Sequence, residues 1–180
     1  MVRSDGHAVR YFFIGPSGSG KTVVAARLAK QLGWPLIDTD EAVRRKTGRD
    51  SIAEVFAGLG ETRFRQLEME ALKDIGIRDA PLLIATGGGL PASPGAMDQI
   101  LDLGVPIYLR AKIDTLWRRL SMAPEGLASR PLLAQGGRDA LESLVQNRID
   151  VYMRASIIFD TDHLGLEGVI SLVARGLDAN

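Results

Sequence analysis

The sequence predicts an α/β fold of three layers, in which helices cover both faces of a doubly wound parallel sheet of five strands. Two observations predict this fold. Short apolar segments alternate along the chain with amphipathic helical segments, which is the pattern of parallel βαβ units. The first apolar segment also runs into a glycine-rich stretch that leads directly into a helix. The chain of 180 residues is expected to form a single domain, 1–180.

Five segments are expected as strands because they are short, apolar and mostly rich in β-branched or aromatic residues: 9–14, 35–38, 81–86, 105–109 and 156–159. Helices are expected at 23–32, 41–46, 51–57, 61–75, 93–103, 113–120, 139–154 and 166–177. Ser51, with Glu54 three residues later, has the spacing of a capping box. Gly60 is expected to separate the helix that follows this box from the next one.

Residues 121–137 differ from the rest of the chain because they lack a clear helical or strand periodicity. They contain two prolines and three glycines, at Pro124, Gly126, Pro131, Gly136 and Gly137. A loop of this length inside a compact domain is usually a lid or a binding loop. We therefore expect a mobile lid over about 121–137.

The composition excludes several classes of protein. Acidic and basic residues balance at 22 each, so no net charge attracts nucleic acid or an anionic membrane. The absence of cysteine excludes disulfides and thiolate metal sites. No apolar run reaches the ~18 residues of a membrane span, and the N-terminus lacks a signal-like segment. We therefore expect a soluble, cytoplasmic protein with neither nucleic acid nor membrane as a partner.

Residues 15–22 read G-P-S-G-S-G-K-T and match the phosphate-binding pattern G-x-x-x-x-G-K-[ST]. The glycines let several backbone N–H groups point at one anion, and the helix that follows adds its positive dipole end. Lys21 is expected to place a charge on the outer phosphates, and the Thr22 hydroxyl is expected to coordinate Mg²⁺. The loop therefore predicts binding of a nucleoside triphosphate. Its expected nucleotide ligands are Gly15, Gly18, Ser19, Gly20, Lys21, Thr22 and Val23.

Two further strand ends carry unusual residues, and ligands in open α/β sheets collect beyond the carboxyl ends of strands. Of Asp38 and Asp40, one can hold the water shell of a metal and the other can accept a proton from a substrate hydroxyl. The alternative is that Asp40 only caps the next helix. The three glycines at 87–89 allow backbone N–H groups to approach a ligand, or form a flexible turn.

The peptide I-D-T-D at 37–40 is similar to F-D-T-D at 159–162. Two strand ends that each cap a helix can be alike by chance, so no internal repeat is inferred.

Taken together, these residues resemble the shikimate kinases over nearly the whole chain. The phosphate loop alone is shared by many families, whereas the combination of segments in this order and at these spacings is specific. After the loop, the segments are L-I-D-T-D (36–40), R-K-T-G-R (45–49), G-E-T-R-F-R-Q-L-E (60–68), T-G-G-G (86–89), S-R-P-L-L (129–133) and N-R-I-D-V-Y (147–152).

This resemblance implies a nucleoside-monophosphate-kinase-like P-loop domain that phosphorylates the 3-hydroxyl of shikimate. ATP is the implied co-substrate and Mg²⁺ the implied metal. The products are shikimate 3-phosphate and ADP, and the pathway is aromatic amino acid biosynthesis. The resemblance also favours a monomer.

For the acceptor, the resemblance implies that Asp40 binds the ring hydroxyls and orients or deprotonates the attacking one. Arg65 and Arg148 would hold the substrate carboxylate, helped by the backbone of Gly87, Gly88 and Gly89. A carboxylate is well matched to guanidinium groups, which bind it in a bidentate manner.

For the nucleotide, the resemblance implies that Asp38 holds the Mg²⁺ shell through water. Arg130 would close over the phosphates from the lid, and Arg119 would lie against adenine. Lys21, Asp40 and Arg130 form the expected catalytic set, because phosphoryl transfer requires positioning and neutralisation of charge.

Two positions depart from the family pattern. After Arg148 the family usually continues x-P-L-Y, whereas here Ile149, Asp150, Val151 and Tyr152 follow, so that an acid stands near a carboxylate-binding arginine. The lid is also longer, at 122–128, which affects the alignment of Arg119.

Two alternative functions remain open. One is a related small-metabolite kinase such as a gluconate kinase, and the other is a non-catalytic nucleotide-binding module with a regulatory role. A GTPase is set aside, because N-R-I-D at 147–150 lacks the lysine of N-K-x-D and lies in a predicted helix.

Overall fold

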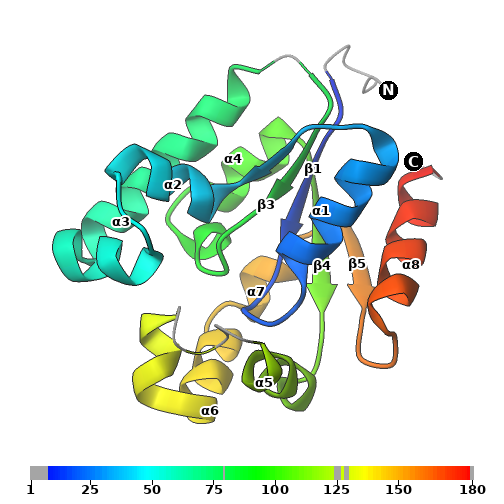
Figure 1. Ribbon diagram of the computed structural model, residues 1–180. Coiled ribbons are helices and arrows are strands. Elements are labelled where there is room, and N and C mark those ends of the chain that lie inside the picture. The colour runs from blue at the N-terminus through cyan, green and yellow to red at the C-terminus, as the bar shows by residue number, and fades with distance from the viewer. Residues whose placement is uncertain (1–7, 79, 124–126, 128–129, 179–180) are drawn as a thin grey trace.

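The sheet consists of five parallel strands in the order β2-β3-β1-β4-β5 (Figure 1). The computed structural model describes residues 8–78, 80–123, 127 and 130–178. The strands are Arg10–Ile14 (β1), Leu36–Asp38 (β2), Leu82–Ala85 (β3), Val105–Arg110 (β4) and Ile157–Asp160 (β5). The chain leaves β1 toward one edge and leaves β3 toward the other, so the topological switch point lies between these neighbours. The predicted doubly wound sheet is confirmed.

Eight α-helices and one short 3-10 helix connect and follow the strands in the described part of the chain. They are Lys21–Leu32 (α1), Thr39–Thr47 (α2), Ile52–Gly76 (α3), Leu90–Ala92 (the 3-10 helix η1), Ala96–Leu103 (α4), Ile113–Met122 (α5), Pro131–Gln146 (α6), Ile149–Tyr152 (α7) and Leu166–Asp178 (α8). No helix among the described residues is sufficiently long and apolar to cross a membrane.

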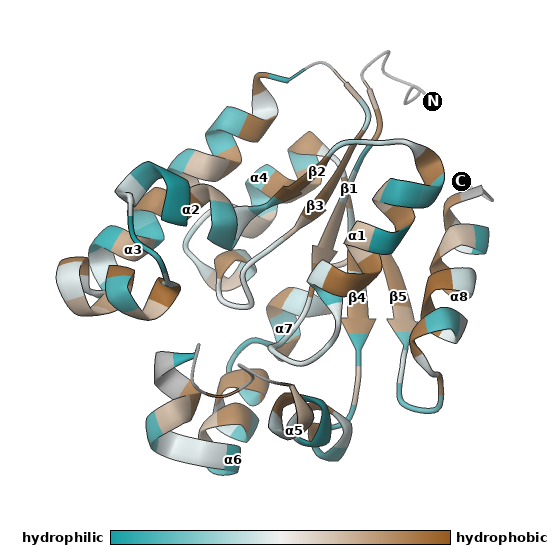
Figure 2. Ribbon diagram, viewed as in Figure 1, coloured by the Kyte–Doolittle hydropathy of each residue, from teal (hydrophilic) through white to brown (hydrophobic). Residues whose placement is uncertain are grey.

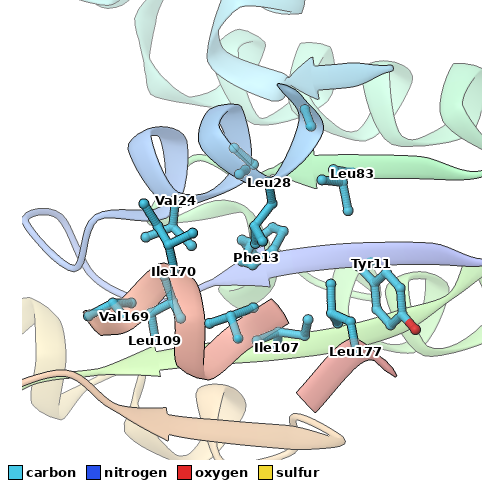
Figure 3. Close-up of a cluster of buried hydrophobic side chains, with 14 of the residues drawn as sticks. Tyr11, Phe13, Val24, Leu28, Leu83, Ile107, Leu109, Val169, Ile170 and Leu177 are labelled. Carbon is cyan, nitrogen blue, oxygen red and sulfur yellow. The ribbon is translucent and has the colours of Figure 1, made fainter. Parts of the chain in front are cut away.

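The two faces of the sheet bury different clusters of side chains, because successive residues of a strand point to opposite faces. In β1, Tyr11 and Phe13 pack against α1 and α8, as Figure 3 shows with Leu28 and Leu177. Phe12 and Ile14 point the other way, toward α3, α4 and α7. Figure 2 shows the resulting pattern, with hydrophobic strands inside and hydrophilic helix surfaces outside. This is the predicted three-layer arrangement.

Two groups of helices lie outside these layers, at the carboxyl end of the strands (Figure 1). Helix α2 and the first part of α3 share a small core around Val43, Val55 and Phe64. Helices α5 and α6 share another around Leu116 and Leu141. Each group presents one side to the space above the sheet edge.

Helix α3 shows the expected interruption at Gly60, whose φ of 74° and ψ of 167° are not helical. The capping box is half formed. The Ser51 hydroxyl accepts a hydrogen bond from the Glu54 N–H at 3.1 Å, as expected. The Glu54 carboxylate, however, accepts from the N–H of Asp50, one residue before the cap.

The segment 121–137, expected as a loop, is helical at both ends, because α5 runs to Met122 and α6 begins within the segment. Helix α6 begins at Pro131, so the second half of the segment 121–137 is helical except at Gly137, whose φ is 58°. Proline suits the first turn of a helix, because its missing N–H has no intrahelical partner there. Residues 124–126 and 128–129 of the expected lid lie outside the described residues.

The single helix expected at 139–154 is instead two helices, α6 and α7, divided at Asn147 and Arg148. The physical reason is that its apolar residues belong to different clusters. Leu141 packs with α5, whereas Ile149 and Tyr152 pack with the core under the sheet. The helix therefore breaks between the two clusters, and Arg148 lies at this break as the N-cap of α7.

Candidate active site

A cleft of about 1000 Å³ opens at the carboxyl edge of the sheet, where ligands of open α/β folds bind. It brings together the three strand ends that the sequence marks and side chains from α3, α5 and α6. Gly15 and Asp38 are near the cleft without lining it. The other expected site residues line it: Gly18, Ser19, Gly20, Lys21, Thr22, Val23, Asp40, Arg65, Gly87, Gly88, Gly89, Arg119, Arg130 and Arg148.

The phosphate loop joins β1 to α1 and has a backbone that requires glycine. Gly15, Gly18 and Gly20 have φ values of 137°, 83° and 94°, which side chains rarely allow. A Cβ on Gly18 would also lie 2.8 Å from the carbonyl oxygen of Leu116. Within the described residues, no side chain caps the first turn of α1, which leaves its N–H groups available to an anion at the helix N-terminus.

Lys21 lies buried across this loop. Its Nζ donates hydrogen bonds to the carbonyl oxygens of Gly15 at 2.8 Å and Pro16 at 2.9 Å. Burial lowers the pKa of the Lys21 ammonium to about 8, and the nearby carboxylate of Asp40 opposes this shift. A phosphate in the loop would add the negative charge that favours the ammonium form.

Asp38 connects the phosphate loop to α2. Its Oδ2 accepts a hydrogen bond from the Thr22 hydroxyl at 2.9 Å, and its Oδ1 accepts from the N–H groups of Asp40 and Glu41. Asp38 is therefore the residue that caps α2, and the alternative reading of Asp40 as that cap is wrong.

The chemistry of Thr22 and Asp38 fits Mg²⁺, which prefers oxygen ligands and takes few of them from the protein. The described residues contain no group of three acidic, histidine or cysteine side chains that would hold a metal by themselves. Substrate phosphates would then complete the metal's ligand shell, as is usual for this ion.

Asp40 is freed for another role. Its Oδ1 is buried and has no hydrogen-bond partner within the described part of the chain. Burial raises the pKa of the Asp40 carboxyl to about 6, and the neighbouring Asp38 raises it further, against the opposing charge of Lys21. A carboxylate with such a pKa is suited to accept a proton near neutral pH.

Arg65 extends from α3 toward Asp40 and pairs with two acids on its own helix. Its Nη1 lies 2.6 Å from Glu68 Oε2, and its Nη2 lies 3.1 Å from Glu61 Oε1. Glu68 is fully buried, with an Oε1 that has no partner among the described residues. Burial raises the pKa of Glu68 to about 7, and the Arg65 guanidinium opposes this shift.

Glu68 is a site residue that sequence reasoning missed. It lies three residues after Arg65, on the same side of the helix, and it closes the segment G-E-T-R-F-R-Q-L-E. The helical pattern places this position on the buried side of the predicted helix 61–75. An acidic residue at a buried position is the sequence signal that could have identified Glu68.

The first glycine of the triple glycine has a structural partner, and two of the three glycines leave room for neighbouring side chains. The N–H of Gly87 donates to the Thr39 hydroxyl at 2.8 Å, so it does not point to a ligand. A Cβ on Gly87 would collide with Asp40 Oδ1 and lie 2.8 Å from Glu68 Oε1. A Cβ on Gly89 would lie 2.5 Å from Arg65 Nη1. These glycines therefore leave room for charged side chains.

Arg148 approaches the same region from the break between α6 and α7. Four residues later, Tyr152 donates a hydrogen bond to the carbonyl of Gly88 at 2.6 Å, which ties α7 to the triple glycine. Burial raises the pKa of Tyr152 to about 12, so its hydroxyl stays protonated as a donor. Asp150 is exposed and does not line the cleft, so this departure from the family pattern leaves the cleft without an added carboxylate.

The opposite part of the cleft lies between α5 and the connection from β5 to α8. Arg119 donates from Nη1 to the hydroxyl of Thr161 at 3.0 Å and from Nη2 to its carbonyl at 2.7 Å. Burial lowers the pKa of the Arg119 guanidinium. Burial also lowers the pKa of Arg130, and the negative charge of Asp40 opposes this second shift. Val23, with 49 % of its surface exposed, forms an apolar wall here together with Leu166.

Comparisons with known proteins agree with one another. A sequence model of the family described as shikimate kinase matches residues 17–175. The chain is 35 % identical over 162 residues to the shikimate kinase of Cereibacter sphaeroides, which covers 89 % of this chain and 76 % of that protein. It is 34 % identical to the shikimate kinase of Thermodesulfovibrio yellowstonii, over 90 % of this chain and 91 % of that protein.

Solved structures show the same likeness. The structure of the shikimate kinase from Acinetobacter baumannii in complex with shikimate has a TM-score of 0.87 and 27 % identity, and covers 96 % of this chain and 94 % of that one. A deoxyadenosine kinase from M. mycoides, with a TM-score of 0.60 and 17 % identity over 96 % of this chain and 100 % of that one, shares the fold.

Proposed function

The chain belongs to the shikimate kinase family, and we propose on this premise that it transfers the γ-phosphoryl group of ATP to the 3-hydroxyl of shikimate. The products are shikimate 3-phosphate and ADP, in the pathway to the aromatic amino acids. The observation that carries the assignment is that Asp40, with its raised pKa, lines one cleft with Lys21 of the phosphate loop and with Arg65, whose charges both act on its carboxylate. A proton acceptor, a phosphate site and a carboxylate site thus share one cleft.

Two halves of the cleft divide the work. We call the phosphate loop with Arg119 and Arg130 the nucleotide half. We call the group formed by Asp40, Arg65, Glu68, Gly87, Gly88, Gly89 and Arg148 the acceptor half. Both meet at Lys21 and Asp40, where the transferred group would pass.

In the nucleotide half, the N–H groups of the loop and of α1 would bind the phosphates. The buried ammonium of Lys21 would turn from its two carbonyl partners to the outer phosphates, where its charge has more effect. Mg²⁺, held by Thr22 and through water by Asp38, would neutralise charge on the phosphates. Arg130 would add a further positive charge, and Arg119 would lie against adenine.

In the acceptor half, Arg65 and Arg148 would bind the substrate carboxylate, because guanidinium groups fix its orientation as well as its charge. The N–H groups of Gly88 and Gly89 would assist, whereas that of Gly87 is used by Thr39. Asp40 would orient the attacking hydroxyl and take its proton.

The shape of the acceptor half favours a ring over an open chain. Phe56 and Phe64 line the cleft with their ring centroids 4.4 Å apart, and Ile52 continues this apolar surface. The Arg65 guanidinium lies over the Phe64 ring, 5.3 Å from its centroid, so this apolar surface is beside the carboxylate clamp. Such a surface suits a cyclic hydroxy acid better than the fully hydroxylated chain of gluconate. This contrast favours shikimate over a gluconate kinase reading.

The proposal also includes a single-domain, monomeric enzyme that acts in the cytoplasm with Mg²⁺. One chain supplies all the expected groups of the cleft, which supports a monomer as the active unit.

The test measures ADP release from Mg·ATP by the purified protein with shikimate and, separately, with gluconate at the same concentration. We expect shikimate alone to stimulate release strongly. Stimulation by gluconate alone would replace the proposed acceptor. ATP binding without stimulation by either compound would favour the regulatory module.

A further inference from the structure

The two D-T-D peptides of the sequence occupy matching places in the fold. Thr39 follows β2 and Thr161 follows β5, and these strands form the two edges of the sheet. Both threonines therefore lie at the carboxyl edge, on opposite sides of the cleft. Both are fully buried, with 0 % of their surface exposed. A buried hydroxyl at such a position needs hydrogen-bond partners, and those partners differ between the two sides.

The Thr161 hydroxyl and carbonyl fix the orientation of Arg119. The hydroxyl donates to the carbonyl of Arg110 at 3.0 Å, which fixes its own rotamer. It then accepts from Arg119 Nη1, while the Thr161 carbonyl accepts from Nη2. Two nitrogens of the planar Arg119 guanidinium thus donate hydrogen bonds to the same residue. These two bonds fix the plane of the guanidinium as well as its position.

The Thr39 hydroxyl fixes the position of the triple glycine on the opposite side of the cleft. It accepts the N–H of Gly87 at 2.8 Å, and so places the start of the triple glycine against β2. Gly87 lies beside Asp40 Oδ1 and Glu68 Oε1, and Gly89 lies beside the Arg65 guanidinium. A shift of this turn would therefore move the surface on which the acceptor half is built.

The flanking aspartates do not explain the similarity of the two peptides. Asp38 caps α2, as expected for a strand that leads into a helix. Asp160 instead forms a two-point ion pair with Arg110, with distances of 2.5 and 2.6 Å. Asp162 accepts the N–H of Lys112, so neither acid of the second peptide caps a helix. What the two peptides share is the buried threonine that holds a cleft element.

We propose that Thr161 and Thr39 are the positioning residues of the two halves of the cleft. Thr161 holds the Arg119 guanidinium flat for stacking on the nucleotide base, and Thr39 holds the triple glycine under the acceptor. This inference rests on the proposed function, because it places ATP in one half and a carboxylate substrate in the other. Neither threonine lines the cleft, so each would act through pre-organisation of the group it holds.

The first test compares Thr161→Val and Thr39→Val, which keep the shape of the side chain and remove its hydrogen bonds. For Thr161→Val we expect the KM for ATP to rise about fivefold to tenfold and the KM for shikimate to stay unchanged. For Thr39→Val we expect the reverse pattern. Thr161→Ser and Thr39→Ser keep the hydroxyl and should restore each value. Equal changes of both KM values in each valine variant would overturn the proposal.

A second test separates the base from the phosphates. Inorganic tripolyphosphate, used as a competitive inhibitor against ATP, has no base to stack on Arg119. Its inhibition constant should therefore be the same in Thr161→Val and in the wild type. A loss of tripolyphosphate affinity as large as the loss for ATP would show that Thr161 supports the loop in general, which contradicts the proposal.

A double-mutant cycle tests whether Thr161 acts through Arg119. In an Arg119→Ala background, Thr161→Val should leave the KM for ATP unchanged, because the group it positions is gone. A further rise as large as in the wild-type background would contradict the proposal. If Thr161→Val fails to fold, Arg119→Lys serves instead. A lysine keeps the charge without bridging the hydroxyl and the carbonyl, so the KM for ATP should still rise.

The wild type distinguishes a failure of this inference from a failure of the proposed function. No turnover of shikimate by the wild type would contradict the proposed function. Turnover by the wild type without the crossed KM pattern would contradict the positioning roles alone.

Discussion

The nucleotide half of the cleft is built largely from backbone, whereas the acceptor half is built from charged side chains that come from distant segments. In the phosphate loop, positive φ values at three glycines and the uncapped N-terminus of α1 shape the proposed anion site. In the acceptor half, Asp40, Arg65 and Glu68 converge from α2 and α3 on the triple glycine. The phosphate loop of the nucleotide half is encoded by one contiguous motif, whereas the groups of the acceptor half are not.

This difference has a consequence for mutations. A site built from backbone groups should keep its ligand affinity after many side-chain changes. It should lose that affinity where a Cβ is added to a glycine of the loop or where the charge of Lys21 is removed. A site of opposed, buried charges is coupled, because each group sets the pKa and position of its neighbours. Changes in the acceptor half are therefore expected to act on shikimate with little effect on nucleotide binding.

The largest expected effect comes from Lys21, the side-chain charge on which the nucleotide half depends. Lys21→Met should lower kcat/KM about 10³-fold, because it removes a fixed positive charge from the phosphoryl-transfer site. Steady-state ADP release measures this change. Lys30→Met, at the exposed end of α1, serves as the control and should have near-normal activity. Retained turnover in Lys21→Met would remove the catalytic role of the loop lysine.

Asp40→Asn should lower kcat by about 10²- to 10³-fold, as expected when a general base is lost. The affinity for Mg·ADP, measured by calorimetry, should stay within about twofold of the wild type. Asp150→Asn is the matched control, since Asp150 is exposed and outside the cleft. A kcat close to that of the wild type would show that the Asp40 carboxylate accepts no proton in the reaction.

Gly89→Ala and Gly88→Ala form a matched pair within the acceptor half. The added methyl group at Gly89 would meet Arg65 Nη1 at 2.5 Å and displace it, which should raise the KM for shikimate about tenfold. At Gly88 the nearest atom would be the backbone nitrogen of Ser17 at 3.4 Å, an ordinary contact. Equal KM values for the two variants would show that the space beside Arg65 is not what requires glycine.

The smallest expected effect concerns stability and Glu68. Its folded-state pKa of about 7 lies above its ordinary value of 4.5, so the stability that the protonated carboxyl contributes is fully present below about pH 4.5. This contribution, up to about 3 kcal/mol, is lost as the pH rises through about 7. Glu68→Gln should therefore show a smaller loss of unfolding free energy between pH 5 and pH 8 than the wild type. Denaturant unfolding at both pH values measures it, and an unchanged loss would contradict the assignment to Glu68.

The features that could be predicted from the sequence differ between the two halves of the cleft in the same way. The five strands and the phosphate loop were predictable, because short apolar segments and a glycine motif are local signals. The break at Arg148 depends on which core each half of the helix packs against. The roles of Glu68, Gly87 and Thr161 depend on which side chains meet in space. A local pattern can mark Glu68 as an acid at a core position. It does not show that Glu68 lies beside Gly87, or that Thr161 binds Arg119, because these contacts join residues far apart in the chain.

The most direct test of the divided cleft is a pair of calorimetric titrations of Arg65→Ala, one with shikimate and one with Mg·ADP. We expect the affinity for shikimate to fall more than about tenfold, because half of its carboxylate clamp is gone, while the affinity for Mg·ADP is retained. Equal losses for both ligands, or an unchanged affinity for shikimate, would contradict the placement of the substrate carboxylate beside Arg65.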